Sequence, residues 1–139
     1  MTDRPVPAAL RWLAALVALC VAAAAISGAV LYAQNLEQIR THANAITGGD
    51  WKRGKTALRR YGCGGCHVIP RLAGANGQVG PDLTGISSRA TLAGKLPNGP
   101  AAMRLWLMHP QHIDPGTGMP EQGIDEATAR DISAYLYAH

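Results

Sequence analysis

The chain has 139 residues, a length that corresponds to one domain, and its formal net charge is +4. Hydrophobic residues make up 47% of it, yet only 5% are aromatic and Phe is absent. Its three cysteines allow at most one disulfide, which excludes a disulfide-rich scaffold. The charge is too small and too scattered to indicate nucleic-acid binding. Because the chain has few large apolar side chains, we expect a bound cofactor to complete its soluble core.

Residues 12–33 carry no charge and are predicted to form a transmembrane anchor. As a helix, this segment spans about 33 Å, enough for a hydrocarbon core of about 30 Å. A cleaved signal peptide is the alternative, but its apolar region is usually about 7 to 15 residues long. Arg4 and Arg11 precede the segment, and the next basic residue is Arg40. This distribution predicts that residues 1–11 form a cytoplasmic head and that the rest lies outside the cytoplasm.

Residues 34–49 are predicted to link the anchor to the soluble domain, first as a helix and then as a flexible joint. Gly48 and Gly49 are expected to end the helix and to act as a hinge. Apolar residues recur at three- and four-residue steps in the helical part, at Leu36, Ile39, Ala43 and Ile46.

The sequence CGGCH at residues 63–67 is the signature for covalent attachment of c-type haem. Two thiols separated by two residues reach the two vinyl groups on one edge of the porphyrin, and the adjacent imidazole is brought under the iron. A thioredoxin-like dithiol would need a βαβ setting, and a zinc site would need a second ligand pair. The motif therefore predicts one haem c, held by thioethers at Cys63 and Cys66 and by His67 as an iron ligand.

Downstream of this motif, residues 50–139 resemble the class I c-type cytochromes. In that family the haem motif also lies near the start of the domain, and a Gly-Pro-x-Leu segment follows it. Residues 80–83, with the sequence GPDL, match that segment. The resemblance implies that the Pro81 carbonyl accepts the Nδ1–H of His67 and that Leu83 packs against the haem. It also implies an all-α fold of about three to five helices around the haem, following the single N-terminal transmembrane helix.

Residues 88–120 are similar, more narrowly, to the haem domain fused to subunit II of some haem–copper cytochrome oxidases. This resemblance implies that Arg89 and Trp106 lie near the haem propionates. The pair of cysteines that a dicopper domain requires is absent, so we expect a free-standing or separately encoded version of that domain.

Helices are predicted in the soluble domain over residues 51–61, 101–108 and 126–138. Asp50 is the expected N-cap of the first, which runs directly into the haem motif. The family resemblance implies that the first and last helices cross closely, with Gly54 receiving the aromatic side chain of Tyr135.

Met119 is the expected second axial ligand of the iron. It stands in the Gly- and Pro-containing loop TGMP, and a Met-Pro pair at this place matches the family. A thioether stabilises ferrous iron and raises the reduction potential, which suits electron transfer. His109 and His112 are the alternative ligands, whereas Met103 and Met108 are expected to pack in the core.

Charge is distributed unevenly within the domain. The first helix carries Lys52, Arg53, Lys55, Arg59 and Arg60, while residues 111–139 contain five acidic residues and one arginine. This asymmetry either orients docking to redox partners or reflects solvated helix faces joined by ion pairs.

These features predict a one-electron carrier rather than an enzyme, because a haem with two strong axial ligands has no open coordination position. We expect it to pass electrons from a quinol-oxidising complex to a terminal oxidase, on the periplasmic side of a bacterial inner membrane, with no small-molecule substrate. The alternative is the cytochrome subunit of a periplasmic dehydrogenase complex. A haem-based gas or redox sensor is a third hypothesis.

Overall fold

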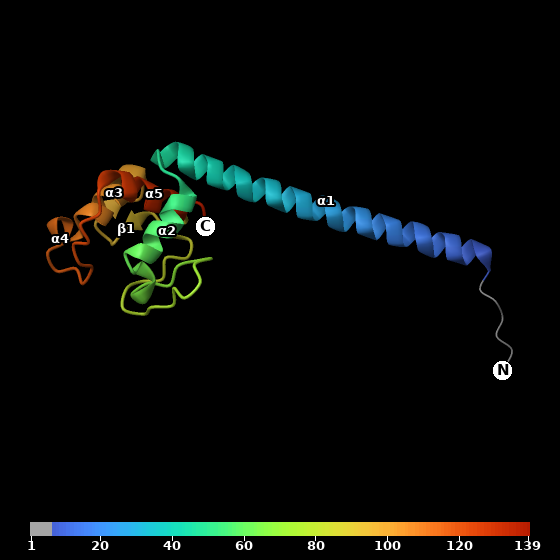
Figure 1. Cartoon of the computed structure of the whole chain (residues 1–139), viewed down its shortest axis with the longest axis horizontal. Helices are drawn as coiled ribbons and strands as arrows, with labels where there is room; N and C mark the ends of the chain where they lie inside the picture. Colours follow the sequence, from blue (N-terminus) through green and yellow to red (C-terminus); the bar gives the residue numbers. More distant parts are fainter. Residues whose placement is uncertain (1–6) are drawn as a thin grey trace. The chain divides into compact units, whose positions relative to one another are not determined.

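The computed structural model describes residues 7–139, so the prediction for residues 1–6 of the N-terminal head lies outside the described part of the chain. The structure is mainly helical, as predicted, and it divides into two compact units, residues 1–37 and 38–139 (Figure 1). The helices are α1 (Ala8–Thr47), α2 (Trp51–Arg60), α3 (Pro100–Met108), α4 (Pro110–Ile113) and α5 (Glu126–Tyr137). Two-residue strands β1 (Thr91–Leu92) and β2 (Leu96–Pro97) form a hairpin, and short 3₁₀ turns cover Cys63–Gly65 and Ile86–Ser88.

The first unit consists of the N-terminal part of α1, which is one unbroken helix in Figure 1. Every residue from 7 to 35 is exposed, including Trp12 at 73% and Leu19 at 67%. The most apolar stretch has a mean hydropathy of 2.5, so the helix is long and apolar enough to cross a membrane. A signal sequence near the N-terminus satisfies the same criteria.

The C-terminal end of α1 belongs to the second unit, and the helix continues to Thr47, as the apolar periodicity predicted. Ile39 and Ile46 are exposed at 40% and 42%, whereas Ala43 and Thr47 are buried. Polar groups also hold this end of the helix. Asn44 Oδ1 accepts a hydrogen bond of 2.9 Å from the backbone N–H of Trp51.

Gly48 and Gly49 follow the end of α1, as predicted. Gly48 has φ +68°, a left-handed conformation that glycine adopts without strain, and its N–H bonds the Asn44 carbonyl at 2.9 Å. A Cβ on Gly49 would lie 2.2 Å from the carbonyl oxygen of Arg130 in α5. Because it has no side chain, Gly49 can pack directly against the backbone of α5.

Helix α2 begins at a side-chain cap, as predicted. The carboxylate of Asp50 accepts hydrogen bonds of 2.9 Å from the backbone N–H groups of Lys52 and Arg53. Its own N–H donates to Asp131 of α5 at 2.7 Å, and Arg53 forms an ion pair with the same carboxylate, also at 2.7 Å. The start of α2 is thus held to the middle of α5 by polar contacts.

The crossing of α2 and α5 is the closest helix contact in the second unit. A Cβ on Gly54 would lie 1.9 Å from the carbonyl oxygen of Asp131 and 3.0 Å from Cβ of Tyr135. Gly54 thus meets Tyr135, as the resemblance implied, but its nearest neighbour is the backbone of α5. Tyr135 is fully buried, and its hydroxyl donates to the Pro70 carbonyl at 2.8 Å.

A cluster of aliphatic side chains from α2, α3, α5 and the connecting segments forms the core. Its most deeply buried large residues are Leu58, Ile132, Leu92 and Tyr135. This arrangement is compatible with the lack of Phe, because Leu and Ile supply most of the buried area between the helices.

The long segment between the haem motif and α3 is organised by polar side chains that the sequence did not single out. The Asn98 amide donates to the carbonyls of Ile86 and Arg89, at 2.8 and 2.7 Å. Its oxygen accepts the Tyr137 hydroxyl at 2.6 Å, and burial raises the pKa of Tyr137 to about 12. The hydroxyl therefore stays protonated at neutral pH and remains a donor, which ties α5 to this segment.

We expect Gly54→Ala to destabilise the domain by about 1 to 3 kcal/mol, because the added methyl group overlaps the α5 backbone. Chemical denaturation of the purified holoprotein measures this loss. Gly99→Ala is the matched control, since a Cβ there meets no atom within 4 Å. Equal stability of the two variants would contradict the close crossing.

Candidate functional site

A tight turn directly after α2 brings the two thiols and the imidazole of the CGGCH motif together. Gly62 reverses the chain with φ +69°, which only glycine adopts without strain. The N–H of Gly65 then bonds the Gly62 carbonyl at 2.9 Å, and the N–H of His67 bonds the Cys63 carbonyl at 3.0 Å. These bonds close one compact turn from which Cys63, Cys66 and His67 all border the same cavity.

A second segment packs against this turn backbone to backbone. The N–H of Gly77 donates to the Gly64 carbonyl at 3.1 Å, and a Cβ on Gly77 would lie 2.2 Å from the Gly65 carbonyl oxygen. A Cβ on Gly64 would lie 2.8 Å from Ala75. Gly64 of the motif thus allows close contact with the following loop.

The same loop orients the imidazole. Nδ1 of His67 lies 2.8 Å from the carbonyl oxygen of Pro81, as the resemblance implied. A carbonyl oxygen can only accept, so Nδ1 carries the proton, and in the neutral imidazole Nε2 keeps its lone pair. Gly80 bonds the Cys66 carbonyl at 2.8 Å, and a Cβ on it would lie 2.3 Å from Cε1 of His67. Gly80 therefore leaves the space that the ring occupies.

The predicted site residues converge on one cavity of about 340 Å³. All eight line it: Cys63, Cys66, His67, Pro81, Leu83, Arg89, Trp106 and Met119. Aliphatic side chains complete the wall, including Leu58, Ile86, Leu92, Leu107 and Leu136. The cavity is therefore an apolar hollow with two thiols, one imidazole and a thioether at its boundary.

Two of the methionines border this cavity. Met119 is half-buried in the loop between α4 and α5, where its N–H bonds the Thr117 hydroxyl at 3.3 Å. Met103 is buried in α3, at 3% exposure, as expected for a core residue. Neither His109 nor His112 is among the described residues that line the cavity. Their place in the structure does not favour either histidine as an axial ligand.

Arg89 borders the cavity but also holds the loop that follows Pro81. Its Nη2 donates to the carbonyl oxygens of Asp82 and, at 3.2 Å, of Thr84. The Asp82 carboxylate accepts the Thr84 N–H at 2.7 Å, and this hydrogen bond lowers the pKa of Asp82. Contacts of Arg89 and Trp106 with haem propionates stay a prediction.

The two motif cysteines differ in environment. Cys63 is half-buried and packs against the apolar core, while Cys66 is exposed. Burial raises the pKa of the Cys63 thiol, and the nearby Cys66 adds to that effect. An unmodified Cys63 is therefore held in the neutral form against the apolar wall.

Comparison with known protein families shows a match to the cytochrome c model over residues 51–138, which is more than half of the chain. The chain belongs to the cytochrome c family. The match supports a class I c-type cytochrome with covalently bound haem c, a haem-based electron carrier. Comparisons with curated proteins and with solved structures found no significant match.

The residues of this cytochrome fit the haem that its family implies. The donor set consists of two thiols and one oriented imidazole on a single turn, beside a mostly apolar cavity. Haem c, when bound, supplies an iron that exchanges one electron between its ferric and ferrous states. The chain would hold it through Cys63, Cys66 and His67, orient the imidazole through Pro81, and keep water away with the aliphatic wall.

Several residues that build the site of this cytochrome were missed by the sequence reasoning. Gly80 was noted as part of a motif, but its clearance for the His67 ring depends on a contact between distant segments. Gly77 and Asn98 likewise depend on distant segments, because each donates a hydrogen bond to a backbone carbonyl of another segment. The one sequence signal that would have indicated them is the presence of glycine and asparagine in loops.

We expect Gly80→Ala to lower the amount of haem per protein several-fold, because the added Cβ displaces the His67 ring. Haem content of the purified protein, measured as the pyridine haemochrome, checks this result. Gly99→Ala is the matched control, since a Cβ there has no atom within 4 Å and Gly99 is not among the described residues lining the cavity. Full haem loading of Gly80→Ala would refute the steric argument.

Proposed function

We propose that this cytochrome is a membrane-anchored, mono-haem carrier that transfers electrons from a quinol-oxidising complex to a terminal oxidase outside the cytoplasm. The observation that carries the proposal is the convergence of Cys63, Cys66, His67 and Met119 on one apolar cavity, in a chain that also has an exposed apolar helix. A carrier needs a buried redox centre and a means of staying near its partners. The cavity would enclose the redox centre, and the apolar helix would keep the protein at the membrane.

In this proposal, His67 and Met119 are the axial ligands of the iron. His67 has Nδ1 engaged by the Pro81 carbonyl, so its Nε2 lone pair is available to a metal. Met119 offers a neutral thioether from a loop anchored by Thr117. One imidazole and one thioether favour the ferrous state and a high potential, as an electron donor to an oxidase requires.

Arg89 and Trp106 are proposed to contact the haem propionates. Both line the cavity, Arg89 as a fixed positive charge and Trp106 through its indole N–H. Neutralising the propionates within a largely apolar cavity would lower the energetic cost of burying them.

The anchor in this proposal is residues 12–33 of α1. All of its side chains are exposed, and the segment carries no charge. Burying those side chains in lipid removes a large apolar area from water. Arg4 and Arg11 on its N-terminal side support an orientation with the haem domain outside the cytoplasm.

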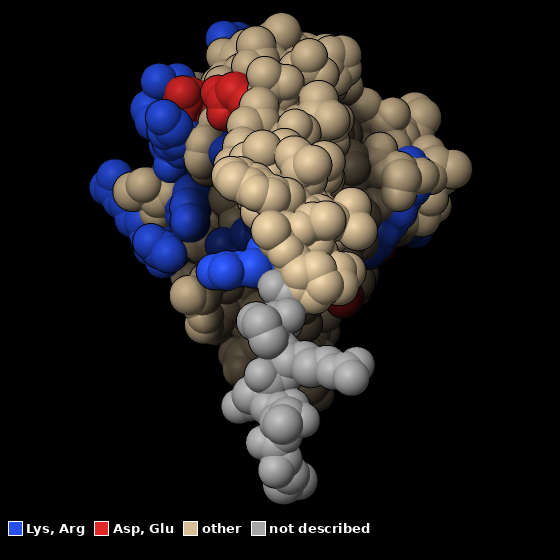
Figure 2. Space-filling model, turned by 90° about the vertical axis from the view of Figure 1, so that its right-hand side faces the viewer, with Lys and Arg blue, Asp and Glu red and all other residues tan. Residues whose placement is uncertain are grey.

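The basic residues of α2 are proposed to guide docking. Lys52, Arg53, Arg59 and Arg60 are exposed, and Arg53 also pairs with Asp131 of α5. Figure 2 shows Lys and Arg side chains on both sides of the face it draws, most of them on the left, with few acidic side chains in view. The Arg53–Asp131 ion pair supports the expectation of charge pairing between the helices, and the exposed basic residues support docking to an acidic partner.

We expect Met119→Leu to abolish the sulfur-to-ferric-iron charge-transfer band and to lower the midpoint potential, because leucine offers no ligand atom. The ferric absorption spectrum and a redox titration measure these effects. Met108→Leu is the control, since Met108 is half-buried and is not among the described residues lining the cavity. A band that survives in Met119→Leu would refute the ligand assignment.

We expect the haem in native membranes to be reduced when quinol is added and reoxidised when oxygen follows, with both rates falling as salt screens the basic surface. Stopped-flow absorption in the haem c bands measures both steps. The Lys52→Glu variant should slow the reaction with at least one partner. A haem that quinol cannot reduce, together with a stoichiometric dehydrogenase subunit in mild detergent, would contradict the carrier role.

A further inference from the structure

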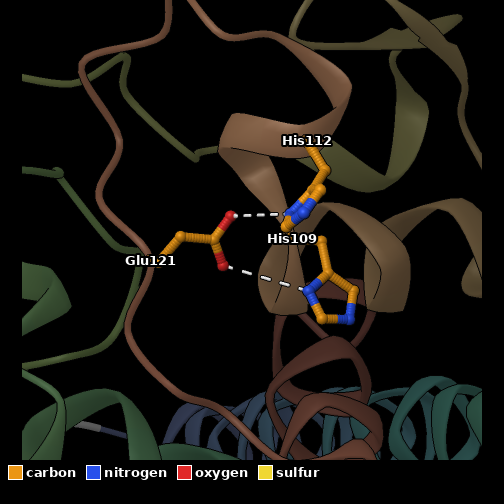
Figure 3. A group of neighbouring side chains, drawn as sticks. All are labelled: His109, His112 and Glu121. Atoms are coloured by element: carbon orange, nitrogen blue, oxygen red, sulfur yellow. Dashed lines mark ion pairs between the residues drawn. The ribbon is translucent and has the colours of Figure 1, made fainter.

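Two histidines and one glutamate, none of them assigned to haem, form a cluster on the surface. His109 ends α3, His112 lies in α4, and Glu121 follows Met119 and Pro120 in the next loop. Nδ1 of His109 lies 3.9 Å from one carboxylate oxygen of Glu121, and Nδ1 of His112 lies 3.6 Å from the other (Figure 3). One donor atom from each residue lies within 4.8 Å of the other two.

The backbone holds this cluster in place. Pro110 is buried and starts α4, which sets the direction of the chain between the two histidines. The N–H of His109 bonds the Leu105 carbonyl at 2.9 Å, and the carboxylate of Glu121 accepts the N–H of Gln111 at 3.2 Å. The carboxylate is therefore directed toward the histidine pair by a hydrogen bond that does not involve the histidine side chains.

We propose that His109, His112 and Glu121 bind a divalent transition-metal ion of the zinc type. Ligand atoms about 2.0 to 2.1 Å from a tetrahedral ion are about 3.3 Å from one another. The distances from Nδ1 of His112 and of His109 to the two carboxylate oxygens of Glu121, 3.6 and 3.9 Å, exceed that value by about 0.3 and 0.6 Å. The side chains of His109 and His112 are 45% and 82% exposed, so rotation of these side chains can bring the three donor atoms to the distances of a bound ion.

The chemistry of the donors selects the ion. Two neutral imidazoles and one carboxylate form a donor set that suits Zn²⁺, Ni²⁺ or Cu²⁺, whereas Ca²⁺ and Mg²⁺ prefer oxygen ligands alone. A bound ion would leave at least one coordination position for water or for a group of another molecule. The histidines also border a surface hollow of about 390 Å³ with Leu105 and Ile113, so the site is open to solvent.

The ion would join α3, α4 and the loop that carries Met119. It would therefore restrain a segment of the chain next to the haem cavity, although His109, His112 and Glu121 are not among the described residues lining that cavity. The metal site does not depend on which residue binds the haem iron, so the two assignments can fail separately.

Calorimetric titration of the chelator-treated holoprotein with Zn²⁺ tests the proposal. We expect one equivalent to bind, and we expect His112→Ala and Glu121→Gln each to weaken binding by about 10-fold or more, since each removes one of three ligands. His42→Ala is the matched control, because His42 is an exposed histidine outside the cluster and should leave binding unchanged. Equal Zn²⁺ affinity in wild type and His112→Ala, or equal binding of Ca²⁺, would overturn the proposal.

Thermal unfolding and the haem spectrum provide a second readout. Because an ion that binds only the folded state stabilises it, Zn²⁺ should raise the melting temperature of wild type but not of His112→Ala. The axial-ligand bands of the haem should stay unchanged in both. A spectral change that is equal in the two proteins would place the zinc at the haem and overturn the assignment.

Discussion

The hydrogen bond between Nδ1 of His67 and the carbonyl oxygen of Pro81 joins the two segments on which the site depends. One segment is the turn after α2 that carries both thiols, and the other is the loop at residues 75–83. Their backbones meet so closely that Gly64, Gly77 and Gly80 have no room for a side chain. The imidazole is therefore held in position by main-chain groups rather than by its own flexible side-chain torsions.

The crossing of α2 and α5 supports that arrangement from the other side. Gly49 and Gly54 both lie against the α5 backbone, and Asp131 bonds the start of α2 through its carboxylate. Because α2 runs directly into the haem motif, a shift of α2 along α5 would move both thiols. Tyr135 adds a restraint, since its buried hydroxyl bonds the carbonyl of Pro70 just beyond the motif. Helix α5 thus positions the site, although Leu136 is its one contribution to the described residues that line the cavity.

Composition and structure are consistent in the soluble domain. Its core consists mainly of aliphatic side chains around a mostly apolar cavity, and no Phe is available to fill that space. A large planar cofactor in the cavity would supply the buried apolar area that aromatic side chains supply elsewhere. The exposed apolar residues of α1 account for much of the remaining hydrophobic content.

Much of this protein was determined by the sequence alone, because the signals are local. The spacing in CGGCH, the charge-free segment, the cap at Asp50 and the helices near residues 51, 100 and 126 each depend on neighbours in the chain. Their boundaries in the structure agree within one residue for α2, α3 and α5, whereas the short helix α4 was not predicted. The cavity also brings together all eight residues that the motifs and the family resemblance indicated.

Contacts between distant segments were decided only by the tertiary structure. Periodicity predicted that α1 continues beyond the apolar segment, but it did not indicate that Asn44 accepts a hydrogen bond from the start of α2 or that Ala43 and Thr47 are buried. The hairpin was missed because two-residue strands carry no periodic signal. The sequence also did not reveal that Gly80 must lack a side chain, or that His109, His112 and Glu121 lie close together. The contact of Gly80 with His67 and the contacts of Glu121 with the two histidines each join residues nine or more positions apart in the sequence. Such contacts form only when the chain folds.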